Sequence, residues 1–190
     1  MIIKKAGFLS GAIVLLMFFG SCVSGAGSRK EAPYVYLTDT SRYTLLPTSG
    51  IEKPLDMAQY VSAAFQGRNF LMISWVKADE TIIEMTLLNE MGINVGELSY
   101  RDGIMAFSSQ ALAGLLKPEY IIADFQLCFY NTGLLGRALK DCGLILETSG
   151  TARRILRGKD LIYEIEIGSE MVKLTNYLRG YSYTLEGDFS

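Results

Sequence analysis

Three cysteines and one pair of carboxylates are the side chains of this 190-residue sequence whose positions suggest chemistry. Cys22 follows an apolar segment near the N-terminus, whereas Cys128 and Cys142 lie in the second half of the chain. Glu164 and Glu166 are two residues apart on a predicted strand and so share one face, and paired carboxylates can perform acid–base catalysis. Because apolar residues alternate with them, we favour a solvated outer face over a catalytic site.

The sequence contains no histidine. This excludes serine–histidine and cysteine–histidine catalysis, zinc bound through histidine and a haem held by histidine. The glycine-rich motifs of nucleotide-binding proteins are also absent from the sequence. We therefore expect a protein that is not an enzyme and that holds neither a cofactor nor a metal. The alternative of an enzyme acting on lipid would need a nucleophile activated by a lysine or a carboxylate.

The first 21 residues have the composition of a secretory signal peptide. Lys4 and Lys5 form a basic start, and an uncharged apolar run over 8–19 follows. An uncleaved transmembrane anchor is an alternative. However, the run has about 12 residues, fewer than the roughly 20 that span a bilayer.

Phe19, Gly20 and Ser21 precede Cys22 and resemble a bacterial lipobox, in which the cysteine is acylated and the chain is cut just before it. Phe19 departs from the pattern, because leucine is commonest at its position. A plain secretory signal with an incidental cysteine is an alternative. Val23 stands where aspartate would signal retention in the inner membrane. The motif predicts a lipoprotein of the cell envelope, held by lipid on Cys22 at the periplasmic face of an outer membrane.

The composition changes after the predicted cleavage site. Residues 22–33 are rich in glycine and serine, which predicts an acylated cysteine and a flexible tether with a reach of about 18 Å. Residues 34–190 predict a single folded domain. Without residues 1–21 the chain keeps 16 basic and 20 acidic residues, because two lysines are removed. No basic cluster remains, so we expect no nucleic-acid partner.

Apolar alternation and turn signals predict strands on both sides of a central helical region. The expected strands are 55–65, 69–77, 81–88, 93–100, 104–107, 144–148, 151–156, 160–167, 171–178 and 181–186. Residues 69–77 are apolar on both faces, which predicts a strand covered on both sides. The predicted fold class is mainly β with inserted helices (α+β). It is a curved antiparallel sheet or open half-barrel of about nine or more strands, with a two-helix lid.

The region 108–143 changes to a helical periodicity, with Pro118 suited to a first helical turn. The apolar face of the first predicted helix consists of Ile121, Ile122, Phe125, Cys128 and Phe129. A second short helix is predicted over 134–142. We predict that a cavity under this lid is lined by Ile121, Ile122, Phe125 and Phe129 of the helix and by Met72 and Trp75 of the strand 69–77. A solid core filled by the same side chains is the equally simple alternative.

Cys128 and Cys142 fall on the two predicted helices. An oxidising envelope permits a disulfide between them. Two separate thiols that behave as small apolar side chains are the alternative, and the sequence leaves both possibilities open.

The segment Ile121–Leu127 reads I-I-A-D-F-Q-L, and the aromatic pair Phe129 and Tyr130 follows it. It resembles the I-L-A-D-L-Q-L helix of a family of uncharacterised LolB-like outer-membrane lipoproteins encoded beside aryl-polyene and fatty-acid-type biosynthesis genes. The stretch 153–156, the strand around Tyr163 and the stretch 176–183 resemble later motifs of that family. The resemblance covers most of the predicted domain. It implies the LolA/LolB fold, an open half-barrel with a helical lid, whose members carry the acyl chains of lipoproteins to the outer membrane.

LolB has an exposed leucine in an N-P-L-G loop between two strands, and this leucine helps to insert lipid into the membrane. Residues 89–92 read N-E-M-G at the corresponding turn. The resemblance therefore implies that Met91 is an apolar tip that faces the membrane, although Glu90 replaces the proline. An ordinary hairpin with an incidental methionine is the alternative. For Asp124 and Gln126, the alternative to a role in cargo binding is that they only cap the lid or bridge it to the sheet.

These observations predict a membrane-anchored module that binds a hydrophobic acyl or polyene-like cargo and carries or inserts it at the outer membrane. Its expected partners are membrane lipid, through the acylated Cys22, the cargo itself, and other envelope or lipoprotein-sorting proteins. The alternative is a structural subunit of an envelope complex, with a solid core and an exposed edge strand for docking.

Overall fold

The computed structural model describes residues 32–65, 67–109, 111 and 117–190. The predicted signal peptide and lipobox, with Phe19, Gly20, Ser21 and Cys22, lie outside the described residues. Among the residues that are described, no helix is long and apolar enough to cross a membrane.

Ten antiparallel strands form one open sheet, with strand order β7-β6-β5-β4-β3-β12-β11-β10-β9-β8. The first half of the sheet consists of β3 (Leu55–Phe65), β4 (Arg68–Ala78), β5 (Ile83–Leu88), β6 (Asn94–Arg101) and β7 (Ile104–Ser108). The second half consists of β8 (Ile145–Ser149), β9 (Ala152–Arg157), β10 (Asp160–Ile167), β11 (Met171–Asn176) and β12 (Tyr181–Glu186). Each half is a meander, and the pairing of β12 with β3 joins them. The edge strands β7 and β8 stand at opposite ends of the order, so the sheet is not closed.

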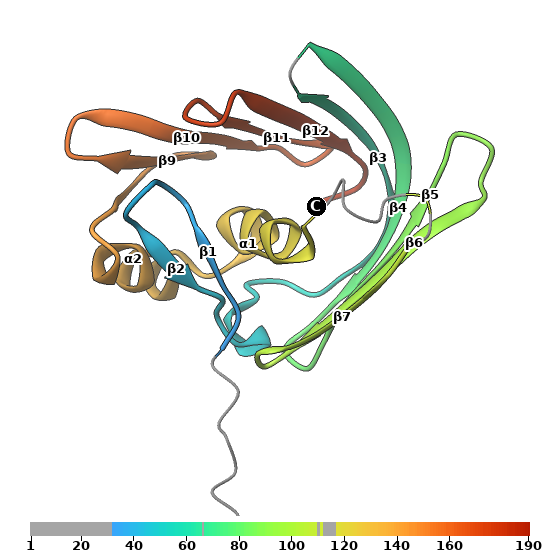
Figure 1. Ribbon diagram of the computed structural model, residues 1–190, viewed down its shortest axis with the longest axis horizontal. Helices are drawn as coiled ribbons and strands as arrows, with labels where there is room; N and C mark the ends of the chain where they lie inside the picture. The colour runs from blue at the N-terminus through green and yellow to red at the C-terminus, as the bar shows by residue number, and fades with distance from the viewer. Residues whose placement is uncertain (1–31, 66, 110, 112–116) are drawn as a thin grey trace, which may run out of the picture. The chain divides into compact units, whose positions relative to one another are not determined.

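The remaining elements lie between or before these meanders. A short ribbon pairs β1 (Tyr34–Tyr36) with β2 (Arg42–Thr44), and a 3-10 turn, η1 (Thr48–Gly50), follows it. The helices α1 (Pro118–Phe129) and α2 (Thr132–Asp141) connect β7 to β8. The sheet curves around α1, which lies on its concave side, and α2 lies near β2 and the end of the sheet (Figure 1).

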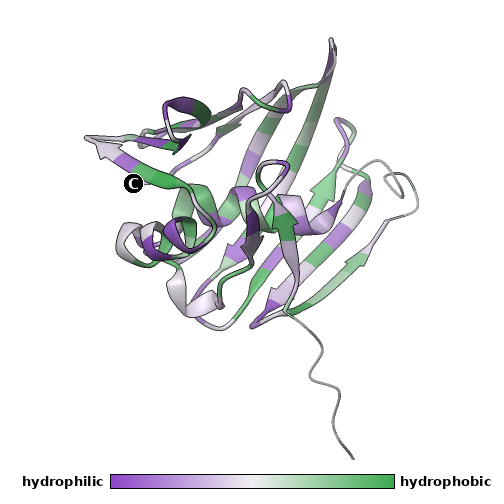
Figure 2. Cartoon of the chain, turned by 60° about the vertical axis from the view of Figure 1, so that its left-hand side comes forward, coloured by the Kyte–Doolittle hydropathy of each residue, from purple (hydrophilic) through white to green (hydrophobic). Residues whose placement is uncertain are grey.

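The two faces of the strands differ in burial, as the period of two requires. In β4, Ser74, Val76 and Ala78 are buried on the concave face, whereas Trp75 and Lys77 between them are exposed on the outer face. Figure 2 shows this alternation as bands of hydrophobic and hydrophilic residues along the strands. The core therefore lies between the concave face and α1.

The predicted mainly β fold, with a curved antiparallel sheet and two inserted helices, agrees with the structure at this level. The prediction that 69–77 is covered on both sides is wrong. Leu71 and Trp75 of this strand are about half exposed, because both helices lie on the concave side of the sheet and leave the outer face open (Figure 1). The sequence also did not predict the ribbon of β1 and β2.

The helix boundaries have local causes. Pro118 occupies the first turn of α1, where its missing N–H costs no hydrogen bond. The side chain of Asn131 caps α2 by accepting hydrogen bonds from the backbone N–H groups of Gly133 and Leu134. Gly143 ends that helix with a φ of 80°, a conformation that glycine adopts without strain.

Candidate functional site

The helix α1 is attached to the rest of the fold by three buried polar side chains. The first is Gln126, whose side-chain oxygen accepts hydrogen bonds from Tyr43 Oη and from the backbone N–H of Leu46, both at 3.0 Å. Its amide nitrogen donates to the carbonyl oxygen of Leu46 at 2.8 Å. Gln126 thus completes the backbone hydrogen bonds of the segment that follows β2, which is a structural role.

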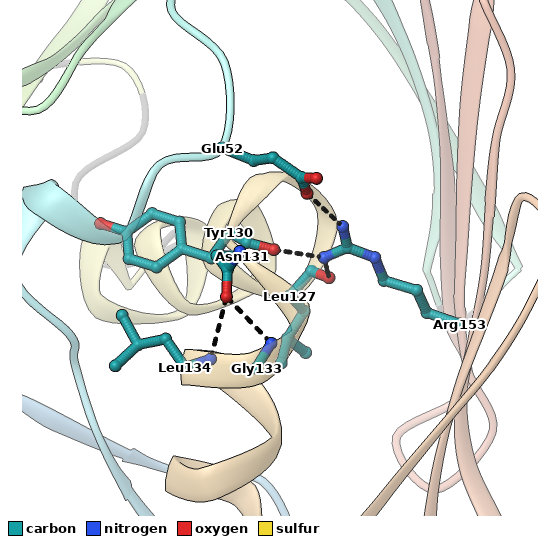
Figure 3. Close-up of polar contacts among 7 residues, drawn as sticks. All are labelled: Glu52, Leu127, Tyr130, Asn131, Gly133, Leu134 and Arg153. Carbon is teal, nitrogen blue, oxygen red and sulfur yellow. Dashed lines mark hydrogen bonds and ion pairs between the residues drawn. The ribbon is translucent and has the colours of Figure 1, made fainter.

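The second attachment is Arg153 on β9, whose guanidinium is buried. Its Nη1 donates to the carbonyl oxygens of Leu127 and Tyr130, at 3.1 and 2.8 Å (Figure 3). Its Nη2 lies 3.3 Å from a carboxylate oxygen of Glu52. The carbonyl groups at the C-terminal end of a helix lack partners within the helix, and a cation suits the negative end of its dipole. Arg153 therefore holds the end of α1 against the second half of the sheet.

The third attachment is Asp124, which faces Tyr181 on β12. Tyr181 Oη donates to the two carboxylate oxygens of Asp124, at 2.8 and 3.0 Å. Burial raises the pKa of Asp124 to about 7, against the lowering effects of this hydrogen bond and of the nearby Arg179 guanidinium. A carboxyl group with this pKa changes charge near neutral pH, so the contact between α1 and β12 depends on pH.

Two further polar groups lie in the same row of the sheet as Tyr181. Tyr163 is opposite Asn176, and Asn176 is opposite Tyr181, so the three side chains share the concave face. Tyr163 Oη and Asn176 Nδ2 are buried, and neither has a hydrogen-bond partner among the described residues. The row therefore places three polar side chains side by side on the concave face.

Beyond α1, the concave face of β12, β3 and β4 continues as an apolar surface. We call it the concave strip: Val61, Ala63 and Phe65 of β3, Phe70 and Met72 of β4, and Tyr183 of β12. The register places Val61 opposite Met72, and Ala63 between Phe70 and Tyr183, so these side chains are neighbours on one face. Phe65 and Phe70 are 43% and 44% exposed. Exposed aromatic side chains on a concave apolar face are suited to contact an apolar ligand.

The residues predicted to line a cavity have different environments. Ile122 and Phe125 are buried in the core, and Ile121 and Phe129 are half-buried against it. Phe129 stacks on Phe189 near the C-terminus, with ring centroids 5.8 Å apart. These four side chains of α1 therefore contribute to packing.

Of the two predicted strand residues, the structure places only Met72 on the concave face, within the strip. The assignment of Trp75 to the cavity lining is wrong. Trp75 lies on the outer face, where its Nε1 donates to Asp56 Oδ1 at 3.1 Å. Apolar residues on both faces of 69–77 gave no sign of which face is concave.

Sequence reasoning missed Phe65 and Phe70 as candidate site residues. Both belong to strands that were predicted correctly, and each is an aromatic residue close to the turn that joins β3 to β4. Aligning the two predicted strands as a hairpin would have put them on the same face as Met72.

Met91 lies where the turn between β5 and β6 is most exposed, with 80% of its surface accessible. The side chain of Asn89 shapes this turn by accepting hydrogen bonds from the backbone N–H groups of Met91 and Ile93. Gly92 has a φ of 75°, which a glycine tolerates. The role of Met91 at a membrane stays a prediction.

The described residues offer little for metal or thiol chemistry. No group of three or more carboxylate, thiol or imidazole side chains is positioned among them to hold a metal ion. Cys128 and Cys142 are both free thiols, and burial raises the pKa of Cys128 to about 12, which keeps it protonated.

Residues 56–187 match the model of a protein family described as "Protein of unknown function (DUF3261)". The match includes β4 to β12, both helices and all but the first residue of β3. No curated protein matches the chain.

Proposed function

We propose that this chain, which belongs to the family described as protein of unknown function DUF3261, binds an acyl or polyene-like chain on the concave face of its sheet and carries or inserts it at a membrane. In this proposal the protein is anchored by lipid on Cys22 at the periplasmic face of the outer membrane, and it performs no chemical step. The half-barrel of the LolA/LolB type is the form of the fold that the proposal assumes.

The observation that carries the proposal is the exposure of Phe65 and Phe70 on the concave strip. In a curved sheet with a helix on its concave side, the side chains of that face normally belong to the core. Here the apolar surface continues past α1 to Phe65 and Phe70, and Arg68 stands opposite Phe65 beside the turn between β3 and β4. An acyl chain lying on it would remove apolar surface from water on both sides of the contact.

Burial of apolar surface supplies the binding free energy. Each buried methylene contributes about 0.8 kcal/mol, so a chain of some 14 carbons could gain at most about 11 kcal/mol before the cost of ordering it. A partly buried chain on an open strip would gain less.

The test is the binding of an apolar fluorescent probe and its displacement by a fatty acid. We expect the probe to bind the folded chain and its emission to fall as the fatty acid is added. A folded chain that leaves the probe free in solution would contradict the proposal.

One observation favours a second function, that of a structural subunit in an envelope complex. The edge strands expose large apolar side chains, Ile104 on β7 and Ile145 on β8. Unpaired edges of this kind can pair with a strand of another protein. A chain that binds no apolar probe but is recovered with one defined envelope protein would favour this function.

A further inference from the structure

The outer face of the sheet carries a second apolar surface, which the concave strip does not use. Tyr60, Leu71 and Trp75 on this face are 60%, 52% and 51% exposed. Tyr60 lies opposite Ile73, and Ile73 lies opposite Leu88, so these two half-buried side chains extend the surface across β3, β4 and β5. We call Tyr60, Leu71, Ile73, Trp75 and Leu88 the outer patch.

The fold does not account for the exposure of the outer patch. Both helices lie on the opposite side of the sheet (Figure 1), and the polar contact of Trp75 is made with Asp56 in the same sheet. A cluster of exposed apolar and aromatic side chains usually marks a surface that a membrane or another molecule covers.

The polarity of this face changes along the strands from a charged row to apolar rows, and the outer rows beyond them, Ser62 with Leu71 and Ala64 with Asn69, are mixed. Its first row is charged, with Asp56, Lys77 and Glu84 in register. Trp75 stands in the next row, and the row of Tyr60, Ile73 and Leu88 follows it. Trp75 donates its indole N–H toward the charged row. Tryptophan and tyrosine with a polar group on one side and an apolar surface on the other are typical of the interface between a bilayer and water.

The row of Tyr60, Ile73 and Leu88 leads into the turn between β5 and β6. This turn follows Leu88 directly and exposes Met91 and Ile93. The exposed apolar side chains of this turn extend the outer patch toward one end of the sheet.

The length of chain outside the structure permits this contact. Gly103 lies close to Pro33, because a Cβ added to this glycine would be 3.6 Å from Cδ of Pro33. The described chain therefore enters the fold beside the turn between β6 and β7. Fully extended, the segment from Cys22 to Pro33 spans at most about 40 Å. The strand β6 is only about 24 Å long. An anchor on Cys22 therefore keeps the outer patch within reach of the membrane.

We infer that the outer patch lies against the surface of a lipid bilayer, with Trp75 and Tyr60 at the level of the headgroups. The inference rests on the membrane anchor in the proposed function, and it concerns the face opposite the cargo strip. Because the charged row holds both signs, the contact does not depend on anionic lipid.

Trp75 is the single tryptophan of the chain, so its fluorescence reports on this face alone. The full chain, carrying lipid on Cys22, is reconstituted into phosphatidylcholine vesicles with or without brominated acyl chains. We expect brominated lipid to quench the emission of Trp75. The double variant Tyr60→Ser, Leu71→Ser should lose this quenching, whereas the control Phe70→Ser, on the concave face, should keep it.

Two results would overturn the inference. The first is an unquenched Trp75 in a chain that floats with the vesicles. The second is a blue shift of the emission that depends on protein concentration and not on brominated lipid, which would assign the patch to a second copy of this chain. Probe binding by the concave strip is measured on the same sample, so the failure of this inference is distinguishable from failure of the proposed function.

Discussion

Asp124 is the residue whose ionisation is most closely tied to the position of α1. Its two carboxylate oxygens share the single O–H donor of Tyr181, and Arg179 is the nearby cation. The neighbouring Tyr163 and Asn176 present buried donor groups without partners among the described residues. Any change in charge at Asp124 is therefore felt at the contact between α1 and the second half of the sheet.

The pH dependence of this contact has a definite sign. Burial raises the pKa of Asp124 to about 7 in the folded chain, compared with about 3.9 for an unfolded aspartate. The folded state thus binds the proton of Asp124 more tightly than the unfolded state does. This proton's contribution to the free energy of unfolding is fully present below about pH 4 and is lost as the pH rises through about 7. The free energy of unfolding of the variant Asp124→Asn should not decrease over this pH range. At pH 8 it should be higher than that of the wild type.

Urea unfolding between pH 4 and pH 8 measures this difference. The control Asp141→Asn removes an exposed carboxylate from the other helix, and it should retain the decrease seen in the wild type. An equally steep decrease in Asp124→Asn would show that another group causes the pH dependence.

Arg153 and Arg154 are adjacent, but they have very different environments. Arg153 is buried and donates to two carbonyl oxygens at the end of α1, whereas Arg154 forms an exposed ion pair with Glu164. The variant Arg153→Met leaves two backbone acceptors and Glu52 without their donor. We expect it to lower the free energy of unfolding by about 2–4 kcal/mol.

The matched control is Arg154→Met, which should cost less than about 1 kcal/mol because surface ion pairs contribute little. Arg153→Lys should fall between the two, since one ammonium group lacks the second nitrogen that reaches Glu52 while the first serves both carbonyls. Denaturant unfolding of the three variants provides the comparison. Equal effects at positions 153 and 154 would contradict the role assigned to Arg153.

At the scale of elements, β3 and β4 support two different surfaces. Their alternate residues form the concave strip on one face and the outer patch on the other. The pairing of β3 with β12 brings Tyr183 beside Ala63 and makes the strip continuous with the surface under α1. The hairpin of β3 and β4 is thus the element on which both proposals depend.

The double variant Phe65→Ser, Phe70→Ser tests the concave strip. Both rings are more than two-fifths exposed, so their loss should affect folding little while it removes apolar contact with a ligand. We expect the affinity for an apolar fluorescent probe to fall about tenfold, which corresponds to about 1.4 kcal/mol. The control Leu71→Ser changes the outer face of the same hairpin and should bind the probe as the wild type does.

For the whole molecule, sequence patterns among neighbouring residues predicted the turns and strands, whereas contacts between distant residues were not predicted. The Asp102–Gly103 turn was predicted from its sequence, and both residues have the positive φ that such a hairpin turn requires. The alternation of 55–65 likewise predicted β3. These features depend on residues that are close together in the chain.

The candidate site depends on contacts that sequence spacing does not show. Val61 lies opposite Leu185, and Asp124 meets Tyr181, although both pairs are far apart in the chain. The face of β4 that becomes concave is decided by the direction of the sheet's curvature, which the apolar residues of 69–77 do not encode. For this reason the sequence did not show that Met72 lies on the concave face and Trp75 on the outer face.

The proposed anchor makes a prediction for the whole chain in the cell. Cys22→Ser should abolish incorporation of labelled palmitate and move the protein to the soluble fraction after an alkaline wash of membranes. Cys142→Ser, which changes a half-buried thiol on the fold, should leave both properties unchanged. A Cys22→Ser protein that stays in the washed membranes would contradict the lipobox assignment.

The measurement that tests the central claim most directly is native mass spectrometry of the purified chain, followed by solvent extraction. If the concave strip carries an apolar cargo, the spectrum should contain a bound molecule of lipid or polyene mass, and Phe65→Ser, Phe70→Ser should lose it. A folded wild-type chain without any adduct, even after incubation with a fatty acid, would contradict the account.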